Sequence, residues 1–295
     1  ILQSVIITNV KQNMKESMQK MSARKIYVGD LFSFYRENKS IGSGGNGAVY
    51  NVTLLSENRL DFPVVAKFFE YEGVHKEKRY NRFKNEIAAL NGLKDITGVM
   101  KVVDKKCPLN VPKSKEEAWY LMPKAKAYKL TRTANLYEKL LDMLQLARII
   151  KCIHERNRAH RDIKPENRLV LDDRLVLSDF GLYWRIEEER LTELDERIGP
   201  YKIMPPELEN VQTDLNLDFR PSDVYLFAKV LWMTLKGDNI GFRGQYQRGD
   251  SQIFLNKVKF GNVITLEPIH RLMQDYIKMD ILLDELEKNM FESRE

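Results

Sequence analysis

The sequence has few cysteines and no long apolar segment. Its two cysteines, Cys107 and Cys152, stand among 295 residues, and neither belongs to a pair with metal-ligand spacing. The sequence therefore predicts neither a disulfide framework nor a zinc cluster, and it favours a reducing, cytoplasmic compartment. No apolar run approaches the roughly twenty residues of a membrane-spanning helix, so we expect no span within this chain. The sequence starts at Ile1 rather than at a methionine, so it leaves open whether flanking domains or a membrane anchor belong to the protein.

A basic tract of the kind that binds nucleic acid is also absent. The chain has 48 basic and 42 acidic residues, a net charge of +6, and the two signs are well mixed. This distribution argues against a nucleic-acid partner, although a mild positive charge suits a polyphosphate. Hydrophobic residues make up 43% of the chain, enough for a sizeable core. At this length one core often divides into two.

Three regions differ in pattern, and together they predict an α+β chain. Residues 1–25 read as a separate docking arm, apolar at first and then with methionines at helical spacing. Residues 26–123 contain mostly strand-like runs, over 39–55, 62–71 and 118–125, with one helical period over 79–95. Residues 124–295 are mainly helical, with long apolar patterns over 134–157 and 222–237. We expect a small β-rich lobe with one helix, followed by a larger α-helical lobe.

A glycine-rich turn lies between two β-branched runs in KSIGSGGNGAVYNVTLL, residues 39–55. Gly42, Gly44 and Gly47 have a spacing that also occurs in dinucleotide-binding folds, but there a helix follows the turn. Here a strand follows. The pattern fits two interpretations, a plain hairpin and a flap whose backbone N–H groups lie over phosphates.

Lys67 stands inside the apolar run VVAKFF. A lysine in such a run is usually an edge residue whose ammonium reaches water. A functional interpretation needs a carboxylate partner, and Glu86 in the predicted helix is a candidate. A lysine held by a glutamate would be a fixed cation for phosphates.

The stretch AHRDIKPENRLVL, residues 159–171, gathers polar side chains between apolar segments. Asp162 could orient and deprotonate a hydroxyl group, Lys164 could neutralise a migrating phosphoryl group, and the Asn167 amide oxygen could ligate a metal. Asp179 in SDFG would complete a magnesium site with Asn167, because Mg²⁺ takes a few protein oxygens together with phosphates and water. The alternatives are a solvated turn and a loop cap.

These motifs, in this order, resemble those of eukaryotic-type Ser/Thr protein kinases. The resemblance covers roughly residues 38–240 and rests on GSGGNGAV at 42–49, VVAK at 64–67, Glu86, HRDIKPEN at 160–167, DFG at 179–181, PPE at 205–207 and SDVY at 222–225. It implies a bilobal protein-kinase-like fold, ATP and Mg²⁺ as cofactors, and a protein substrate with a Ser or Thr hydroxyl. The Lys in DIKPEN resembles the Ser/Thr class rather than the tyrosine kinases.

Site residues follow from the same resemblance. The implied catalytic set is Asp162, Lys164, Lys67 and Glu86, and the implied metal ligands are Asn167 and Asp179. The implied nucleotide-binding set is Gly42, Ser43, Gly44, Gly45, Gly47, Val49, Ala66, Lys67, Met122, Lys124 and Ala125. Within it, Val49 and Ala66 would contact adenine, Met122 would be the gatekeeper, and residues 123–125 would form the hinge.

The chain departs from the family at a few positions. Pro200 stands where a threonine usually bonds the catalytic carboxylate and lysine, and Arg168 follows Asn167 where an apolar residue is common. Arg161 resembles the arginine that reads a phosphorylated activation loop, and Thr192 is the candidate phosphosite. The alternative is that the acidic residues around Thr192 order the loop without phosphorylation. Two alternatives to a protein kinase stay open: a nucleotide-binding scaffold without catalysis, and a kinase acting on a non-protein substrate.

Overall fold

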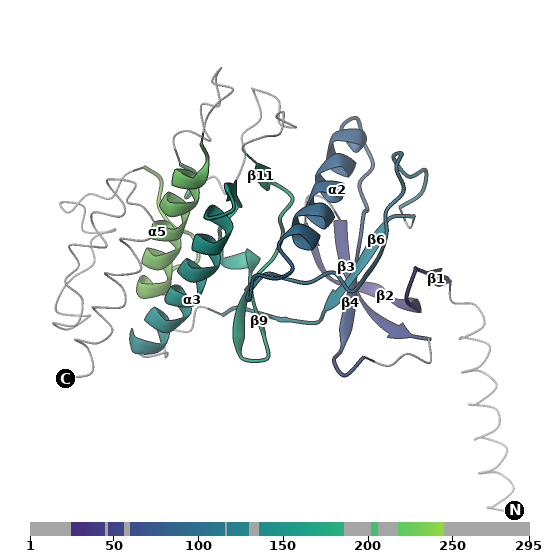
Figure 1. The fold of residues 1–295 in the computed structure, drawn as a ribbon, viewed down its shortest axis with the longest axis horizontal. Coiled ribbons are helices and arrows are strands. Elements are labelled where there is room, and N and C mark those ends of the chain that lie inside the picture. Colours follow the sequence, from purple (N-terminus) through teal and green to yellow (C-terminus); the bar gives the residue numbers. More distant parts are fainter. Residues whose placement is uncertain are drawn as a thin grey trace, which may run out of the picture. The chain divides into compact units, whose positions relative to one another are not determined.

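A computed structural model describes residues 25–44, 47–55, 60–115, 117–129, 136–185, 202–205 and 218–244 (Figure 1). Two compact units divide the chain: Ile1–Glu70 with Val103–Met122, and Tyr71–Val102 with Pro123–Glu295. The predicted division into 26–123 and 124–295 differs from these units, because residues 71–102 and Pro123 group with the second unit. The predicted arm, residues 1–25, lies almost entirely outside the described residues.

The first unit is a six-stranded sheet in which neighbouring strands are antiparallel wherever a register is resolved. Its strand order is β1-β2-β3-β4-β6-β5. The strands are β1 (Ile26–Val28), β2 (Ser33–Gly44), β3 (Gly47–Leu54), β4 (Val64–Phe68), β5 (Asp104–Lys106) and β6 (Trp119–Pro123). The strand-like patterns predicted over 39–55, 62–71 and 118–125 are confirmed, since alternating and β-branched residues suit a pleated, half-buried surface.

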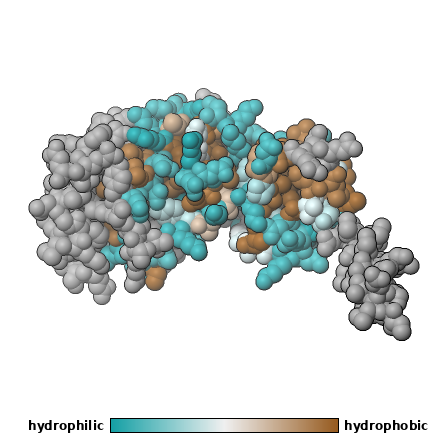
Figure 2. All heavy atoms as spheres, turned by 90° about the horizontal axis from the view of Figure 1, so that it is seen from below, coloured by the Kyte–Doolittle hydropathy of each residue, from teal (hydrophilic) through white to brown (hydrophobic). Residues whose placement is uncertain are grey.

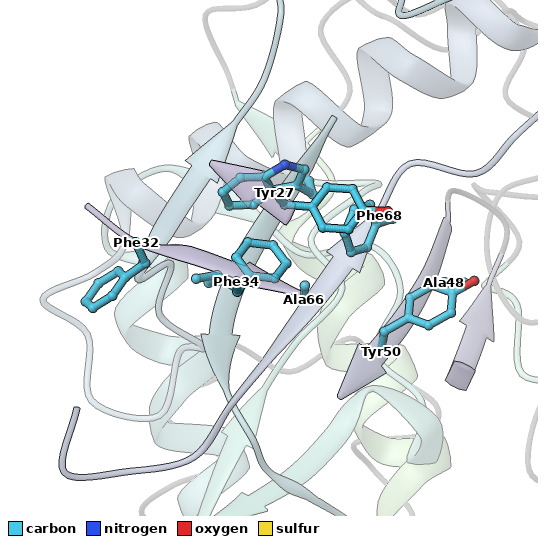
Figure 3. Close-up of a cluster of buried hydrophobic side chains, with 9 residues drawn as sticks. Tyr27, Phe32, Phe34, Ala48, Tyr50, Ala66 and Phe68 are labelled. Carbon is cyan, nitrogen blue, oxygen red and sulfur yellow. The ribbon is translucent and has the colours of Figure 1, made fainter. Parts of the chain in front are cut away.

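One face of this sheet carries an aromatic core. The cluster consists of Tyr27, Phe32, Phe34, Ala48, Tyr50, Ala66, Phe68, Trp119 and Leu121 (Figure 3). Phe34 lies edge-on to Trp119, with 4.8 Å between ring centroids, and such a pair adds to the stabilisation from burial alone. Because side chains alternate across a strand, this core fixes which residues of β3, β4 and β6 point to the other face.

Apolar side chains are also exposed at the sheet's first strand. Ile26 and Val28 of β1 are both more than half exposed. Figure 2 shows apolar atoms, in brown, among hydrophilic ones on the face that it presents. Within the part of the chain that the structure describes, we find no helix whose length and hydropathy would let it cross a bilayer.

The second unit is built mainly from helices. They are α2 (Lys76–Gly92), α3 (Leu136–His154) and α5 (Arg220–Lys236), with a short 3₁₀ turn, η1 (Pro165–Asn167). The small strands are β7 (Lys126–Ala127), β8 (Arg158–Ala159), β9 (Arg168–Leu171), β10 (Arg174–Leu177) and β11 (Trp184–Arg185). All three helical periods predicted from the sequence are confirmed.

Helix α5 packs beside α3 in this unit (Figure 1). Fourteen of its residues, Ser222–Leu235, are buried without interruption, as expected for a helix that is apolar almost all round. It ends at Gly237, whose φ of 69° is the left-handed conformation that glycine adopts without strain. Asp223, in its first turn, is completely buried, and a buried carboxylate requires partners.

Candidate active site

Asp223 of α5 holds the polar loop that begins at His160. Its carboxylate accepts hydrogen bonds from the backbone N–H groups of His160 and Arg161, each at 2.7 Å. The His154 imidazole of α3 lies 3.0 Å from the same carboxylate. Arg161 has a φ of 68°, an unfavourable conformation for a residue with a side chain. The two charge-assisted bonds stabilise this conformation and thereby set the direction in which the loop continues.

His160 joins the loop to the segment before Asp179. Its Nδ1 accepts the backbone N–H of Asp162 at 3.2 Å, and its Nε2 lies 3.2 Å from the Ser178 carbonyl oxygen. These two partners require a neutral imidazole with its proton on Nε2. The ring also packs edge-on against Phe180, with 4.5 Å between centroids. His160 therefore connects the loop to the DFG segment through two contacts, one with the Ser178 carbonyl oxygen and one with the Phe180 ring.

Asp162 lies in the middle of this loop and is 6% exposed. Its Oδ2 accepts hydrogen bonds from Lys164 Nζ at 2.6 Å and from Asn167 Nδ2 at 2.9 Å. Its Oδ1 is buried and has no hydrogen-bond partner among the described residues. An unsatisfied buried carboxylate oxygen is costly unless a ligand supplies a donor. A hydroxyl group is a suitable donor for Oδ1.

The environment of Asp162 makes it a stronger base than an ordinary aspartate. Burial raises the pKa of its carboxyl group, the Lys164 ammonium partly opposes this effect, and the negative charge of Asp179 adds to it. A raised pKa improves a carboxylate as proton acceptor as long as the group remains ionised at the working pH. The predicted chemistry of Asp162 and Lys164 therefore has a geometric basis within this loop.

Asn167 directly precedes β9 and Asp179 follows β10 by two residues, so the β9–β10 pairing brings their two segments together. The backbone N–H and the hydroxyl of Ser178 both donate to the Asn167 carbonyl oxygen, at 3.0 and 3.1 Å. Asn167 Nδ2 donates to the backbone oxygen of Asp162 as well as to its carboxylate, so the amide oxygen is the atom of this side chain that could serve as a ligand. Asp179 has a φ of 61°, so the chain turns sharply at the second candidate ligand.

This donor set fits Mg²⁺. One carboxylate and one amide oxygen are hard ligands, and Mg²⁺ is usually held by one or two protein groups with phosphates and water. Among the residues that the structure describes, no group of three or more His, Cys, Asp or Glu side chains gathers as a metal site. A cage made only of such protein ligands is thus not found among the described residues.

The glycine-rich turn of the first unit is a hairpin between β2 and β3. Its register pairs Gly42 with Val49 and Gly44 with Gly47, while Gly45 lies outside the described residues. A Cβ at Gly47 would lie 2.0 Å from the Phe68 carbonyl oxygen. No atom of the described residues lies within 4 Å of a Cβ built at Gly42 or at Gly44. Gly47 is thus required for the close approach of β3 to β4, whereas the described residues do not crowd Gly42 or Gly44.

We expect Gly47→Ala to destabilise the protein by about 3 kcal/mol, because the clash is with backbone that cannot rotate away. Gly42→Ala is the matched control. It should leave the free energy of unfolding within about 1 kcal/mol of the wild type and instead weaken ATP binding. Urea unfolding of both variants, followed by ATP titration, checks this assignment. Equal stability of the two variants would contradict a packing role for Gly47.

Strand pairing puts Lys67 and Val49 on one face of the sheet. The two residues are direct register partners on β4 and β3, and Lys67 is 9% exposed. Ala66 pairs with Tyr50 and lies on the opposite face, in the aromatic core (Figure 3). The sequence interpretation of Ala66 as an adenine contact is therefore incorrect, because the strand pleat directs its side chain away from Lys67. Val65 takes its place on the Lys67 face.

The remaining nucleotide-binding candidates lie on or after β6. Met122 is nearly buried, and strand alternation puts it on the face opposite Leu121 and the aromatic core. Lys124 is exposed and Ala125 half-buried, between β6 and β7. Ser43 pairs with Ala48 in the glycine hairpin. Their contacts with a nucleotide stay predictions.

Glu86 is fully buried in α2, on the side of the helix that carries Phe83 and Ile87. Lys67 and Glu86 belong to different compact units, so their ion pair stays a prediction.

Arg161 is the candidate phosphate-reading arginine. Its guanidinium carbon lies 4.2 Å from the centroid of the Phe219 ring. Thr192 and Pro200 lie outside the described residues.

Sequence reasoning gave no role to two residues that organise this site, His160 and Asp223. Both lie inside the kinase-like motifs HRDIKPEN and SDVY. The available signal for Asp223 was a carboxylate at the start of an otherwise apolar helix. Its partners lie more than sixty residues earlier in the chain, so spacing could not identify them.

Comparisons with known proteins agree with this geometry. The family model described as "Protein kinase domain" matches residues 35–279. A probable serine/threonine-protein kinase of Clostridium acetobutylicum is 26% identical over 212 residues, 70% of this chain and 30% of that protein. The serine/threonine-protein kinase PTK2 of Candida glabrata is 29% identical over 205 residues, 62% of this chain and 25% of that protein. The chain thus spans less than a third of the length of these relatives.

Among solved structures, the ROP18 kinase domain, in complex with AMP-PNP and sucrose, matches with a TM-score of 0.66. The match covers 92% of this chain and 86% of that one at 17% sequence identity. At this identity the likeness concerns the fold alone. It confirms the α+β, protein-kinase-like fold expected from the sequence.

Proposed function

We propose, on the basis that this chain belongs to the protein kinase family, that it transfers the γ-phosphoryl group of Mg-ATP to Ser or Thr hydroxyls of a protein substrate. The observation that carries this proposal is Asp162, a buried carboxylate with one oxygen held by Lys164 and Asn167 and the other without a donor among the described residues. Relatives named serine/threonine-protein kinases support the same acceptor class.

In the proposed reaction, Asp162 Oδ1 accepts a hydrogen bond from the substrate hydroxyl and so directs its oxygen toward the phosphorus. The hydroxyl proton passes to the Asp162 carboxylate as the new O–P bond forms and the bond to ADP breaks. Lys164, whose ammonium already bonds the Asp162 carboxylate, stabilises negative charge on the migrating group. Most of the rate enhancement then comes from positioning and charge stabilisation.

Asn167 and Asp179 are the proposed magnesium ligands, and the bound ion would neutralise charge on the nucleotide phosphates. Gly42, Ser43, Gly44, Gly45 and Gly47 form the proposed cover of those phosphates, and Lys67 with Glu86 keeps the role that the family resemblance gives it. Val49, Val65 and Met122 are the proposed adenine contacts from the first unit, and Lys124 and Ala125 those from the proposed hinge. We also propose lobe boundaries near 26–123 and 124–295 and a cytoplasmic location.

An acceptor screen with γ-labelled ATP tests this function. The acceptors are Ser/Thr-only peptides, Tyr-only peptides, RNA and small alcohols, each with Mg²⁺ and with a chelator. Label on Ser/Thr peptides that requires Mg²⁺ supports the proposal. Label only on RNA or alcohols would replace it with a kinase for non-protein substrates. Nucleotide binding without label on any acceptor would favour a scaffold.

A further inference from the structure

Arg168 follows Asn167 directly, at the start of β9, and its side chain is completely buried. Arginine is rarely found fully buried, because removing a guanidinium from water is costly unless ligands or counter-charges replace the water. An apolar residue would fill the same position without this cost. The presence of Arg168 therefore calls for a reason beyond packing.

Its side chain contacts three other segments of the second unit. Nη1 donates to Thr234 Oγ1 of α5 at 3.2 Å and lies 3.5 Å from Met143 Sδ of α3. The guanidinium carbon lies 4.2 Å from the centroid of the Tyr128 ring, in the chain just after β7. A planar guanidinium over an aromatic face is a directional contact, unlike the packing of an apolar side chain.

Tyr128 in turn is fixed by a carboxylate. Its hydroxyl donates to Asp142 of α3 at 2.7 Å, so cation, ring and carboxylate form a chain of contacts. The backbone repeats the connection, because the Tyr128 N–H donates to the Arg168 carbonyl oxygen at 3.1 Å. Arg168 thus joins the segment after the proposed hinge to the start of β9 through both main chain and side chain.

The guanidinium keeps its charge in this environment. Burial lowers the pKa of Arg168 to about 10, while Tyr128 and Asp142 oppose that change, so the group stays protonated at neutral pH. Among the described residues, Nε and Nη2 of Arg168 have no hydrogen-bond partner. A protein with a buried cation that has so few hydrogen-bond partners is less stable than one with an apolar side chain of the same volume at that position.

We infer that Arg168 is a positioning residue for Asn167, holding the proposed metal ligand in place through directional contacts with Tyr128, Thr234 and Met143. Asn167 is the next residue in the chain, its amide bonds Asp162, and its carbonyl accepts two bonds from Ser178. A rotation at Arg168 is therefore transmitted to Asn167 and, through Ser178, to the segment that carries Asp179. The role in metal binding rests on the proposed function, whereas the positioning of Asn167 does not.

Arg168→Met tests the inference, because methionine replaces the guanidinium with a flexible apolar chain. We expect a melting temperature equal to or above that of the wild type, since a buried charge is removed. We also expect roughly tenfold weaker apparent Mg²⁺ affinity in ATP-binding titrations, the loss typical when a group that orients a metal ligand is removed. ATP affinity without metal should stay within about twofold. A residue that served only stability would not give this combination.

Hydrogen exchange supplies a readout that needs no activity. In Arg168→Met, amide exchange should accelerate at Asn167 and Ser178 but not in the middle of α5. Arg174→Met is the matched control, since Arg174 is exposed at the other end of the same β-hairpin. Arg168→Lys keeps the charge without the planar group and should restore part of the Mg²⁺ affinity; it also serves if the methionine variant does not fold.

Unchanged exchange at Asn167 and Ser178, together with unchanged Mg²⁺ dependence, would overturn the inference. If wild-type ATP binding shows no response to Mg²⁺, the proposed function fails instead, and the exchange experiment alone decides on Arg168. Faster exchange in Arg168→Met than in Arg174→Met then supports the positioning role. Equal exchange in the two variants rejects it.

Discussion

Asp162→Asn should lower kcat by roughly 10²–10⁴-fold, the usual contribution of a positioned acid or base, while ATP affinity stays within about twofold. The substitution keeps the shape of the side chain but removes its negative charge. An amide cannot accept the hydroxyl proton, and its NH₂ group would meet either the donors of Lys164 and Asn167 or the substrate hydroxyl. Steady-state kinetics with Mg-ATP and a Ser/Thr peptide measure this effect.

Glu166→Gln is the control for this prediction, because Glu166 lies in the same loop, is exposed, and undergoes the same chemical change. Its kcat should stay within about twofold of the wild type, as expected for an exposed charge. Retention of more than a tenth of wild-type kcat by Asp162→Asn would contradict the assignment.

The pH dependence of the wild type should also reflect Asp162. Because burial raises the pKa of Asp162, wild-type kcat/KM should fall as the pH drops through a value above the pKa of an ordinary aspartate.

Asp223→Asn should destabilise the protein by about 2–4 kcal/mol and lower kcat at least tenfold. The carboxylate accepts two buried N–H groups with its two oxygens. An asparagine offers one oxygen, so one N–H of the loop faces an NH₂ group and is left unsatisfied in a buried place. Arg161 would then lose a contact that stabilises its left-handed backbone conformation.

Asp218→Asn serves as the matched control at the N-terminal end of the same helix. Asp218 forms a partly exposed ion pair with Arg220, 2.7 Å long, and ion pairs in contact with solvent contribute about 1 kcal/mol or less. Urea unfolding curves and peptide kinetics of both variants give the comparison. A stability of Asp223→Asn within 1 kcal/mol of the Asp218 variant would show that the loop does not depend on this carboxylate.

Local patterns predicted the elements of the fold well. The helical period over 79–95 corresponds to α2, and the strand-like run at 62–71 corresponds to β4. These predictions succeed because a 3.6-residue or two-residue repeat of apolar side chains is enough to choose the local structure when one face is buried. The loop around Asp162 was likewise predictable, since its polar residues are close together in sequence.

The features that sequence patterns do not predict depend on strand pairing or on contacts between residues far apart in the chain. Ala66 was misassigned because the motif gives the order of residues, whereas the pleat decides which face each side chain occupies. The bonds of Asp223 and the contacts of Arg168 join segments that lie tens of residues apart. The repeat of apolar residues in the sequence does not predict such contacts, because they arise only when α3, α5 and β9 pack together.

Phosphoryl transfer from Mg-ATP to Ser/Thr hydroxyls by the loop from Asp162 to Asn167 can be measured in a single turnover. The reaction contains γ-labelled ATP, Mg²⁺ and a Ser/Thr protein acceptor, and it compares the wild type with Asp162→Asn. We expect label on phosphoserine or phosphothreonine with the wild type and at least a hundredfold slower transfer with the variant. Equal rates in the two proteins, or no transfer by a wild type that binds Mg-ATP, would contradict the proposed function.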